Sequence, residues 1–377
     1  MTWEGIGTDA AAVREALARA RHGLVDREIV AEVTTLCVVA GEHLLVVGPP
    51  GTAKSEAVRR VAHQIGGRYF EYLLGRFTEP NEIFGPVDLQ RLRDGVVEFE
   101  TRNMLPEADV AFIDEVFLGS TAILNTLLGI LNERLFRRGS TALLCPLRVC
   151  VGATNSLPED HTLLAFADRF LARIFVEPVS DTRIEELLET GWRAADPKAE
   201  DGRLLSALDR LSVARRNCDL APVRPILARA VRRLRAAGIA ISDRRAVRTQ
   251  SLVAAAAVLD GRSTAATQDL WVLPLVAPTA DTQQLARDTL ADLIETSRNA
   301  SLLHSAAELS AGLLAHADRL VTATTELLAD LPKTPLTLDD RLRVEAALRE
   351  MDATIPAQVL ANGLGDLRLR LVNALEP

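Results

Sequence analysis

The chain has 377 residues, which is enough for two or three domains at about 150 residues each. Hydrophobic residues make up 48% of it and aromatic residues only 4%, so Leu, Val, Ile and Ala must form most of the cores. The formal net charge is -8, which argues against nucleic acid as the main partner but leaves a local basic patch open.

The sequence shows neither the pattern of an export signal nor that of a membrane segment. The first residues include Glu4 and lack the basic-then-apolar order of a signal peptide. No apolar run approaches the roughly 20 residues that span a bilayer. None of the cysteines forms a Cys-x-x-Cys pair, and we interpret them as free thiols of a reducing compartment: Cys37, Cys145, Cys150 and Cys218. We therefore expect a cytoplasmic protein that does not insert into a membrane.

Short apolar runs alternate with helical patterns over the first part of the chain. Helices are predicted at 10–21, 27–40, 56–62, 120–131 and 163–170. In the first of them, Val13, Leu17 and Ala18 would form the apolar stripe. Strands are predicted at 44–47, 68–74, 109–113, 143–151 and 172–176. Such alternation is typical of a parallel sheet that is covered by helices on both faces.

The alternation is interrupted once and ends at Pro178. Residues on both sides of Asp94-Gly95 alternate in polarity, which predicts a hairpin with strands at 87–92 and 96–100. After Pro178 only helices are predicted, at 181–190, 203–217, 223–237 and 243–259, then in long amphipathic stretches at 281–330, 338–352 and 356–375. We predict an α/β core at 1–179, a helical lid at 180–278 and a C-terminal helical extension at 279–377.

Residues 48–56 join the strand at 44–47 to the next helix, which is the setting of a phosphate-binding loop. Successive N–H groups form an anion nest, and the start of the helix adds unpaired N–H donors and a positive dipole end. Lys54 is positioned to reach the β- and γ-phosphates, and Ser55 offers a hydroxyl to Mg²⁺. A chance match in a turn that contains glycine and proline is the alternative. The predicted nucleotide-binding residues here are Gly48, Pro49, Pro50, Gly51, Thr52, Ala53, Lys54, Ser55 and Glu56.

Two acids, Asp114 and Glu115, follow the apolar strand at 109–113. Ligands of parallel sheets bind at the carboxyl ends of the strands, so these acids would face the phosphates. Asp114 would hold Mg²⁺, and Glu115 would accept a proton from the attacking water or orient it. Without the phosphate loop, a solvated acidic turn would be the simpler interpretation.

Polar residues at other strand ends are further candidates. Asn155 ends a strand and would position the same water or contact the γ-phosphate, although asparagine is also common in turns. Arg169 precedes the last strand, where it could reach the nucleotide of a neighbouring subunit or form a surface salt bridge with Asp168 or Glu177. Arg173 is its competitor for the role in a neighbour's site.

The lid helix predicted at 243–259 offers an arginine as well. Ser242 or Asp243 can cap this helix, and Arg244 then lies in its first turn, able to swing toward phosphate. An exposed arginine on a basic helix is an equally good interpretation of the pattern. Between Arg244 and Arg245 the sequence alone does not decide.

Together these motifs resemble the Walker A, Walker B, sensor 1 and arginine-finger motifs of AAA+ ATPases. Ala53 before Lys54 is similar to the form common in the MoxR branch, and segment 242–245 resembles its sensor 2. Four further segments are similar to the regulatory ATPase RavA subgroup, namely 77–86, 105–109, 123–128 and 131–134. The resemblance covers roughly residues 10–275. It implies an AAA+ P-loop core with a parallel sheet and an all-helical lid, to which this chain adds a helical extension.

The resemblance also implies ligands and partners. ATP or ADP with Mg²⁺ would bind at subunit interfaces of a homo-oligomer, a hexameric ring, and Leu24 and Val25 would lie against the adenine. The expected hairpin at 87–100 would belong to the helix-2 insert. Family members are thought to remodel or activate client proteins, often with a von Willebrand factor A domain partner. No β-rich stretch after residue 280 resembles the small inserted barrel of RavA.

Two other functions stay open. Related AAA+ proteins are helicases, but the acidic balance of this chain disfavours a nucleic-acid motor. A nucleotide-switched scaffold would bind ATP, turn it over slowly or not at all, and recruit partners through the helical extension. The sequence favours an ATPase motor that acts on proteins.

Overall fold

The computed structural model describes residues 3–180, 183–193, 203–294, 297–310, 312–331, 337–354 and 364–375. Its centre is a five-stranded sheet with the order β2-β3-β6-β1-β7, in which all neighbouring strands are parallel. The strands are β1 (Leu44–Val47), β2 (Tyr69–Leu73), β3 (Val110–Asp114), β6 (Val149–Thr154) and β7 (Ala172–Phe175). Their carboxyl ends therefore share one edge of the sheet, as the alternation of strands and helices predicts.

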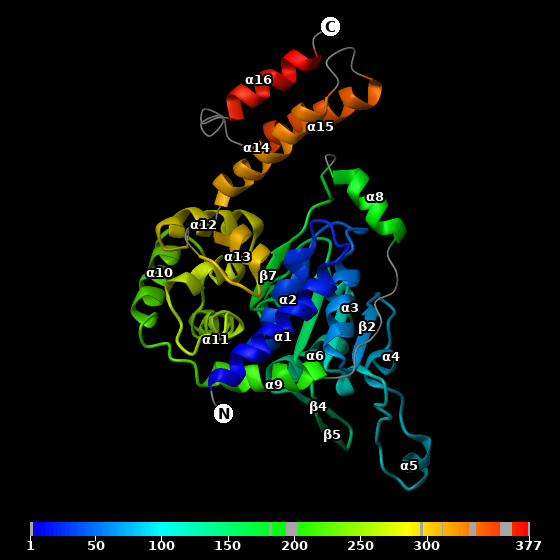
Figure 1. The fold of residues 1–377 in the computed structure, drawn as a ribbon. Helices are drawn as coiled ribbons and strands as arrows, with labels where there is room; N and C mark the ends of the chain where they lie inside the picture. Colours follow the sequence, from blue (N-terminus) through cyan, green and yellow to red (C-terminus); the bar gives the residue numbers. More distant parts are fainter. Residues whose placement is uncertain are drawn as a thin grey trace.

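The two faces of the sheet are covered by different helices (Figure 1). Successive side chains of a strand point to opposite faces of the sheet, and in β1 Leu44 belongs to one apolar cluster while Leu45 belongs to another. On the first face pack α1 (Trp3–Arg21), α2 (Glu28–Ala40), α3 (Lys54–Ile65) and α9 (Arg203–Arg216). The second cluster contains residues of α4 (Pro80–Phe84), η1 (Leu105–Glu107), η2 (Val116–Leu118), α6 (Thr121–Glu133) and α7 (His161–Ala167).

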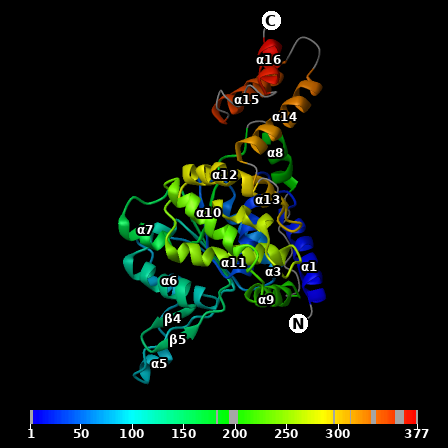
Figure 2. The ribbon, with the colours of Figure 1, turned by 90° about the vertical axis from the view of Figure 1, so that its left-hand side faces the viewer.

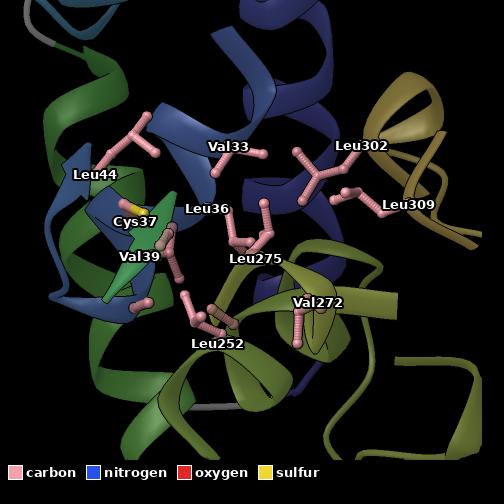
Figure 3. Close-up of a cluster of buried hydrophobic side chains, with 14 of the residues drawn as sticks. Val33, Leu36, Cys37, Val39, Leu44, Leu252, Val272, Leu275, Leu302 and Leu309 are labelled. Carbon is pink, nitrogen blue, oxygen red and sulfur yellow. The ribbon is translucent and has the colours of Figure 1, made fainter. Parts of the chain in front are cut away.

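Helix α2 lies between the sheet and a group of C-terminal helices. Every residue from Ile29 to Ala40 is buried, which is the pattern of a helix packed on all sides. Figure 3 shows Val33, Leu36 and Val39 of α2 among residues of the later helices. Those elements are α10 (Arg224–Ala236), α11 (Asp243–Leu259), η4 (Thr267–Val272), η5 (Pro274–Val276), α12 (Ala280–Ile294) and α13 (Leu303–Ser310).

The last helices stand apart from this body (Figures 1 and 2). They are α14 (Gly312–Asp330), α15 (Leu338–Thr354) and α16 (Leu364–Leu375). Their buried side chains, among them Leu327, Val344 and Leu371, form a separate apolar cluster. Helix α8 (Ile184–Arg193) lies on the outside of the body and has exposed apolar side chains.

The predicted hairpin at 87–100 is wrong, because neither 87–92 nor 96–100 forms a strand. Val87 does pair with Phe99, but Leu89–Arg93 form the short helix α5. The side chain of Asp88 causes this, because it accepts hydrogen bonds from the backbone N–H groups of Gln90 and Arg91 and caps a helical turn. The prediction also missed β4 (Leu135–Arg138), which forms an antiparallel hairpin with β5 (Thr141–Leu144). Figure 2 shows α5 and this hairpin projecting together from the body.

Smaller corrections concern burial. In α1, Val13 and Leu17 are buried as predicted, but Ala18 is exposed, and Ala16 and Ala20 occupy the buried face in its place. The prediction of free thiols is confirmed, with Cys37, Cys145 and Cys150 buried and Cys218 half-buried. Among the described residues, no helix is both long enough and apolar enough to cross a membrane.

Candidate functional site: a phosphate loop at the carboxyl edge of the sheet

The loop after β1 has the backbone of an anion-binding nest. Gly51 has a φ of +78° and Ala53 a φ of 54°, both in the left-handed region. Helix α3 then begins at Lys54 without any side-chain cap, so its first N–H groups stay available as donors. Gly48 must lack a side chain, because a Cβ atom there would lie 2.3 Å from the carbonyl oxygen of Val176.

Lys54 is held inside this loop by the backbone. Its Nζ atom donates to the carbonyl oxygens of Gly48 at 2.7 Å and Pro49 at 2.9 Å. Burial lowers the pKa of the ammonium group, while the charges of Asp114 and Glu115 act in the opposite direction. The lysine of β1's loop and the acids that end β3 are thus brought to one place, as predicted. Ser55 and Glu56 follow in the first turn of α3, where the Glu56 carboxylate accepts from Arg60 Nε at 2.7 Å.

Asn155 joins the acids through its side chain. β6 lies between β3 and β1, so the residue that follows it lies between the two acids and the phosphate loop. The Asn155 Nδ2 group donates to Oε1 of Glu115. Glu115 has a φ of 49°, and its own N–H donates to Oδ1 of Asp114 at 3.0 Å. Burial and the neighbouring Asp114 raise the pKa of Glu115, and Lys54 opposes the shift.

Arg27, which the sequence analysis did not single out, holds the phosphate loop in place. Arg27 is buried, and its Nε atom donates to the carbonyl oxygen of Thr52 at 2.6 Å. A second nitrogen donates to the carbonyl oxygen of Glu177, which follows β7. The guanidinium therefore ties the phosphate loop to the end of the neighbouring strand. A single arginine at the start of a helix has no pattern that would have revealed this role.

The segment proposed to hold the adenine lies beside this loop. Leu24 and Val25 are both buried, and Nη1 of Arg60 in α3 donates to the carbonyl oxygen of His22 at 2.6 Å. Next along the chain, Arg27 contacts the loop itself. The segment therefore runs alongside the first turns of α3, which leads from the phosphate loop.

The donor set fits a nucleotide with a magnesium ion. The uncapped start of α3 and the side chain of Lys54 supply donors and positive charge for phosphate oxygens. The hydroxyl of Ser55 and the carboxylate of Asp114 are oxygen ligands of the kind that Mg²⁺ prefers. Ser55, Asp114 and Glu115 are each only partly buried, so the edge is open to a ligand.

The predicted arginines lie at the other edge of the sheet. Arg169 and Arg173 flank the start of β7, which is an amino end. Arg173 is buried, donates to the carbonyl oxygens of Pro278 and Ala167, and has its pKa lowered to about 10 by burial and by Arg245. Arg169 is only partly buried, and its Nε atom has no hydrogen-bond partner among the described residues.

The lid arginines also lie away from Lys54. Ser242 caps α11, since its hydroxyl accepts from the N–H of Arg245. Arg245 is buried, pairs with Asp168 at 2.9 Å and donates to several carbonyl oxygens. Arg244 is exposed and donates to Oδ1 of Asn132 at 2.7 Å, at the end of α6. The structure thus brings Lys54, Asp114, Glu115 and Asn155 together, whereas Arg169 and Arg244 approach each other at the amino edge.

Fold and site define a class: a P-loop nucleotide-binding core of the AAA+ kind with a helical lid. Comparison with family models specifies it further. Residues 11–213 match the MoxR domain of the MoxR-vWA-beta-propeller ternary systems, and residues 223–284 match an AAA lid domain. The chain belongs to the MoxR family of AAA+ ATPases.

Individual relatives agree with this family. The chain is 35% identical to protein MJ0079 and 34% identical to protein MJ0812 of Methanocaldococcus jannaschii, each alignment covering 64% of this chain. It spans 63% and 65% of those relatives, slightly under two thirds of their length. Chaperone MoxR1 of Mycobacterium tuberculosis is 25% identical over 190 residues, 49% of each chain. A solved structure of a candidate ATPase from Cytophaga hutchinsonii has the same fold, with a TM-score of 0.62 at 15% identity over 76% of this chain and 96% of that one.

Proposed function

We propose that this chain is a Mg²⁺-dependent ATPase that hydrolyses ATP to ADP and phosphate. The meeting of Lys54 with Asp114, Glu115 and Asn155 at one sheet edge supports this proposal most directly. A loop that only bound phosphate would not need a second carboxylate held by an amide at the same place. The combination of a cation, a metal-binding acid and a positioned base is what phosphoryl transfer to water requires.

Each residue of the proposed site has its own role in binding or hydrolysis. Lys54 and the N–H groups of residues 48–56 bind the phosphates, and Leu24 and Val25 contact the adenine. Ser55 and Asp114 hold the metal ion, which neutralises charge on the phosphates when it is bound. Glu115 accepts the proton of the attacking water, and Asn155 orients Glu115 through the hydrogen bond between their side chains. The raised pKa of Glu115 moves it toward the range in which a carboxylate acts as a base near neutral pH.

We further propose that the arginines act on the site of a neighbouring copy. Arg169 and Arg244 lie at the amino edge, and the phosphate loop lies at the carboxyl edge, so neither arginine can complete the site of its own subunit. A head-to-tail contact, repeated until it closes, would bring one edge against the other. A hexameric ring is the closed form we expect. Arg169 is the better candidate because the guanidinium of Arg173 is held by backbone carbonyls.

The natural targets are proposed to be proteins. One relative is named a chaperone, and the matching family model is named for systems that contain a vWA partner. We therefore expect client remodelling together with a von Willebrand factor A domain partner. We also propose that the chain belongs to the RavA subgroup. We do not favour nucleic acid as its target. The free cysteines support a cytoplasmic location.

The test is a comparison of binding and turnover. Glu115→Gln should bind ATP with unchanged affinity, measured by calorimetry, and should lose hydrolysis by a factor of roughly 100 or more. Glu326→Gln on α14 makes the same chemical change far from the site and should behave as wild type. Wild-type turnover in Glu115→Gln would contradict the assignment. Intact ATP binding with negligible turnover in the wild type would favour the nucleotide-switched scaffold instead.

A further inference from the structure

Helix α8 exposes an apolar face. Its large apolar residues Ile184, Leu187, Leu188 and Trp192 follow one another at helical spacing and lie on one side of the helix. Trp192 is 92% exposed and Leu188 68% exposed. Burying a large apolar side chain stabilises a protein by about 1.5–3 kcal/mol, so a face of this kind indicates a contact with another molecule.

Acidic residues border this face. Glu185 and Glu189 project next to the Trp192 side of the helix, because positions three or four residues apart share a side. Glu186 lies further around the helix from the apolar face, and its carboxylate pairs with Arg183 at 2.8 Å. The exposed surface of α8 is therefore apolar with an acidic margin, and its partner should be apolar with a basic margin.

The helix is fixed next to the phosphate loop. Arg183, just before α8, pairs with Asp26. Asp26 precedes Arg27, whose guanidinium donates to the carbonyl oxygen of Thr52 in that loop. Any molecule that covers α8 therefore lies close to the nucleotide site.

A surface of the opposite character lies at the other end of the subunit, and Figure 1 shows α8 and α9 far apart. A cavity of about 580 Å³ opens there between α2, α6, α9 and α11. Six arginines line it against two carboxylates, Glu42 and Asp209. We name this cavity the arginine basin and define it by its arginines, which are Arg134, Arg148, Arg215, Arg216, Arg244 and Arg248.

Only part of this positive charge is paired. Arg248 pairs with Glu42, Arg148 with Asp209, and Arg134 donates to carbonyl oxygens at the ends of α2 and α6. The other three arginines have no carboxylate within 4.0 Å among the described residues, and they are Arg215, Arg216 and Arg244. Burial lowers the pKa of Arg215, and the charge of Arg216 lowers it further. The basin thus has an excess of positive charge that an acidic partner would relieve.

Exposed apolar side chains lie on the helices that form the basin. Val213 on α9 is 47% exposed and Val247 on α11 is 65% exposed. They lie close in sequence to Arg216 and Arg244 on the same helices. The region therefore offers apolar contact area beside unpaired arginines, which is the complement of α8.

We propose that α8 of one subunit docks on the arginine basin of the next copy of this chain. Glu185 and Glu189 face the unpaired arginines of that basin, and the Trp192 side of α8 covers its exposed valines. The two surfaces lie at opposite ends of the subunit, so each copy uses one surface on each side and the contact repeats head to tail. This inference rests on the assembly proposed above and names the contact that holds it.

Docking here would link assembly to nucleotide. The docked basin carries Arg244, and α8 is tied through Asp26 to the segment that holds the phosphate loop. A ligand that orders the loop would therefore order α8 as well, and would strengthen the contact with the neighbour. A second copy fits the complementary charges better than a separate apolar partner, because both halves of the contact are present on one chain.

The experiment measures self-association by sedimentation in ATP and Mg²⁺, in a Glu115→Gln background that retains nucleotide. Glu185→Arg and Arg216→Glu each place like charges in the contact and should weaken association about tenfold or more. The double variant restores opposite charges and should recover most of the loss. Trp192→Ser should weaken association too, and Glu326→Arg on α14 is the matched control that should not.

A cross-link tests the direction of the contact. In a background in which Cys218 is replaced by serine, a chain with Glu189→Cys mixed with a chain carrying Arg216→Cys should form a disulfide-linked dimer, whereas neither chain should do so alone. Unchanged association in Glu185→Arg and Trp192→Ser, with assembly intact, would overturn the docking and leave the proposed function standing. A wild type that binds and hydrolyses ATP as a monomer would overturn both the docking and the ring. Loss of binding to a separate partner protein, with normal self-association, would assign α8 to that partner instead.

Discussion

The two edges of the central sheet differ in how their polar groups are satisfied. At the carboxyl edge, Asp114, Glu115 and Ser55 are partly exposed, while Lys54 and Arg27 are buried. At the amino edge, the buried His43 is bonded on both sides: it accepts from the N–H of Cys150 at 2.9 Å and donates to the carbonyl oxygen of Leu131 at 3.0 Å. The acids of the carboxyl edge are thus open to a ligand, whereas His43 at the amino edge links β6 to the end of α6.

The charges at the two edges differ as well. The carboxyl edge combines one lysine with two acids, while the amino edge gathers arginines in excess of its acids. Burial lowers the pKa of His43 well below its ordinary value, so this residue adds no positive charge. Among the described residues, neither edge contains both the groups that bind phosphate and metal and an arginine that would stabilise the transition state. The comparison supports the proposal that the unit of function is a pair of subunits, and the following variants test it.

The largest effect should come from the carboxyl edge. Lys54→Ala removes the ammonium group that the loop carbonyls hold, and ATP binding should fall by a factor of about 100 or more, since each 1.4 kcal/mol is tenfold in affinity. Calorimetry with ATP and Mg²⁺ measures it, and circular dichroism controls for folding. An affinity equal to that of the wild type would sink the assignment of the phosphate loop.

At the amino edge, Arg169→Ala should leave ATP binding intact and lower turnover by roughly a hundredfold or more. Its Nε atom has no partner among the described residues, so the fold should tolerate the change. Mixing this variant with Glu115→Gln should recover activity, because some interfaces in mixed assemblies then carry both wild-type residues. Mixed assemblies that stay inactive would mean that Arg169 acts within its own subunit or only on structure, and Arg173 would be tested next.

A smaller effect is expected from Gly48→Ala. The added Cβ would lie 2.3 Å from the carbonyl oxygen of Val176, so the loop or β7 must shift. We expect a loss of about 1–3 kcal/mol in the free energy of unfolding, the usual cost of overpacking, together with weaker ATP binding. Gly5→Ala is the control, since that position has open space and lies in a helix, where alanine is favoured. Equal stability of the two variants would show that the loop is more adaptable than its geometry indicates.

The smallest effect is a shift in pH dependence. Burial and Asp114 raise the pKa of Glu115 above its ordinary value of 4.5. The protonated, inactive form therefore persists to higher pH, and the acid limb of the turnover profile should have its midpoint above 4.5. Stopped-flow phosphate release over a pH series measures this, with circular dichroism at each pH as the control for folding. A midpoint at or below the ordinary value would argue against Glu115 as the base.

Local patterns predicted the carboxyl edge well. The strand, loop and helix around Lys54 and the acids after β3 depend on short stretches of sequence, and the parallel order of strands then brings them together. Other features depend on contacts that no pattern encodes. Asp88 turns an expected strand into α5 by capping it, and Arg27 reaches the phosphate loop from a distant segment. The position of Arg244 follows from how α11 packs on α2, so the sequence could name this arginine but not the edge at which it lies.

The burial of α2 has a consequence for movement. One apolar cluster runs from Ile6 in α1 through α2 and α11 to Leu309 in α13, and it contains buried residues of both the sheet and the lid helices. Separating the lid from the sheet would expose large apolar side chains to water. The free-energy cost is about 25 cal/mol for each Å² of apolar surface that becomes exposed. Bending between the core and the lid is therefore costly. In the assembly proposed above, we therefore expect movement driven by ATP at the contacts between subunits and not between the core and the lid of one chain.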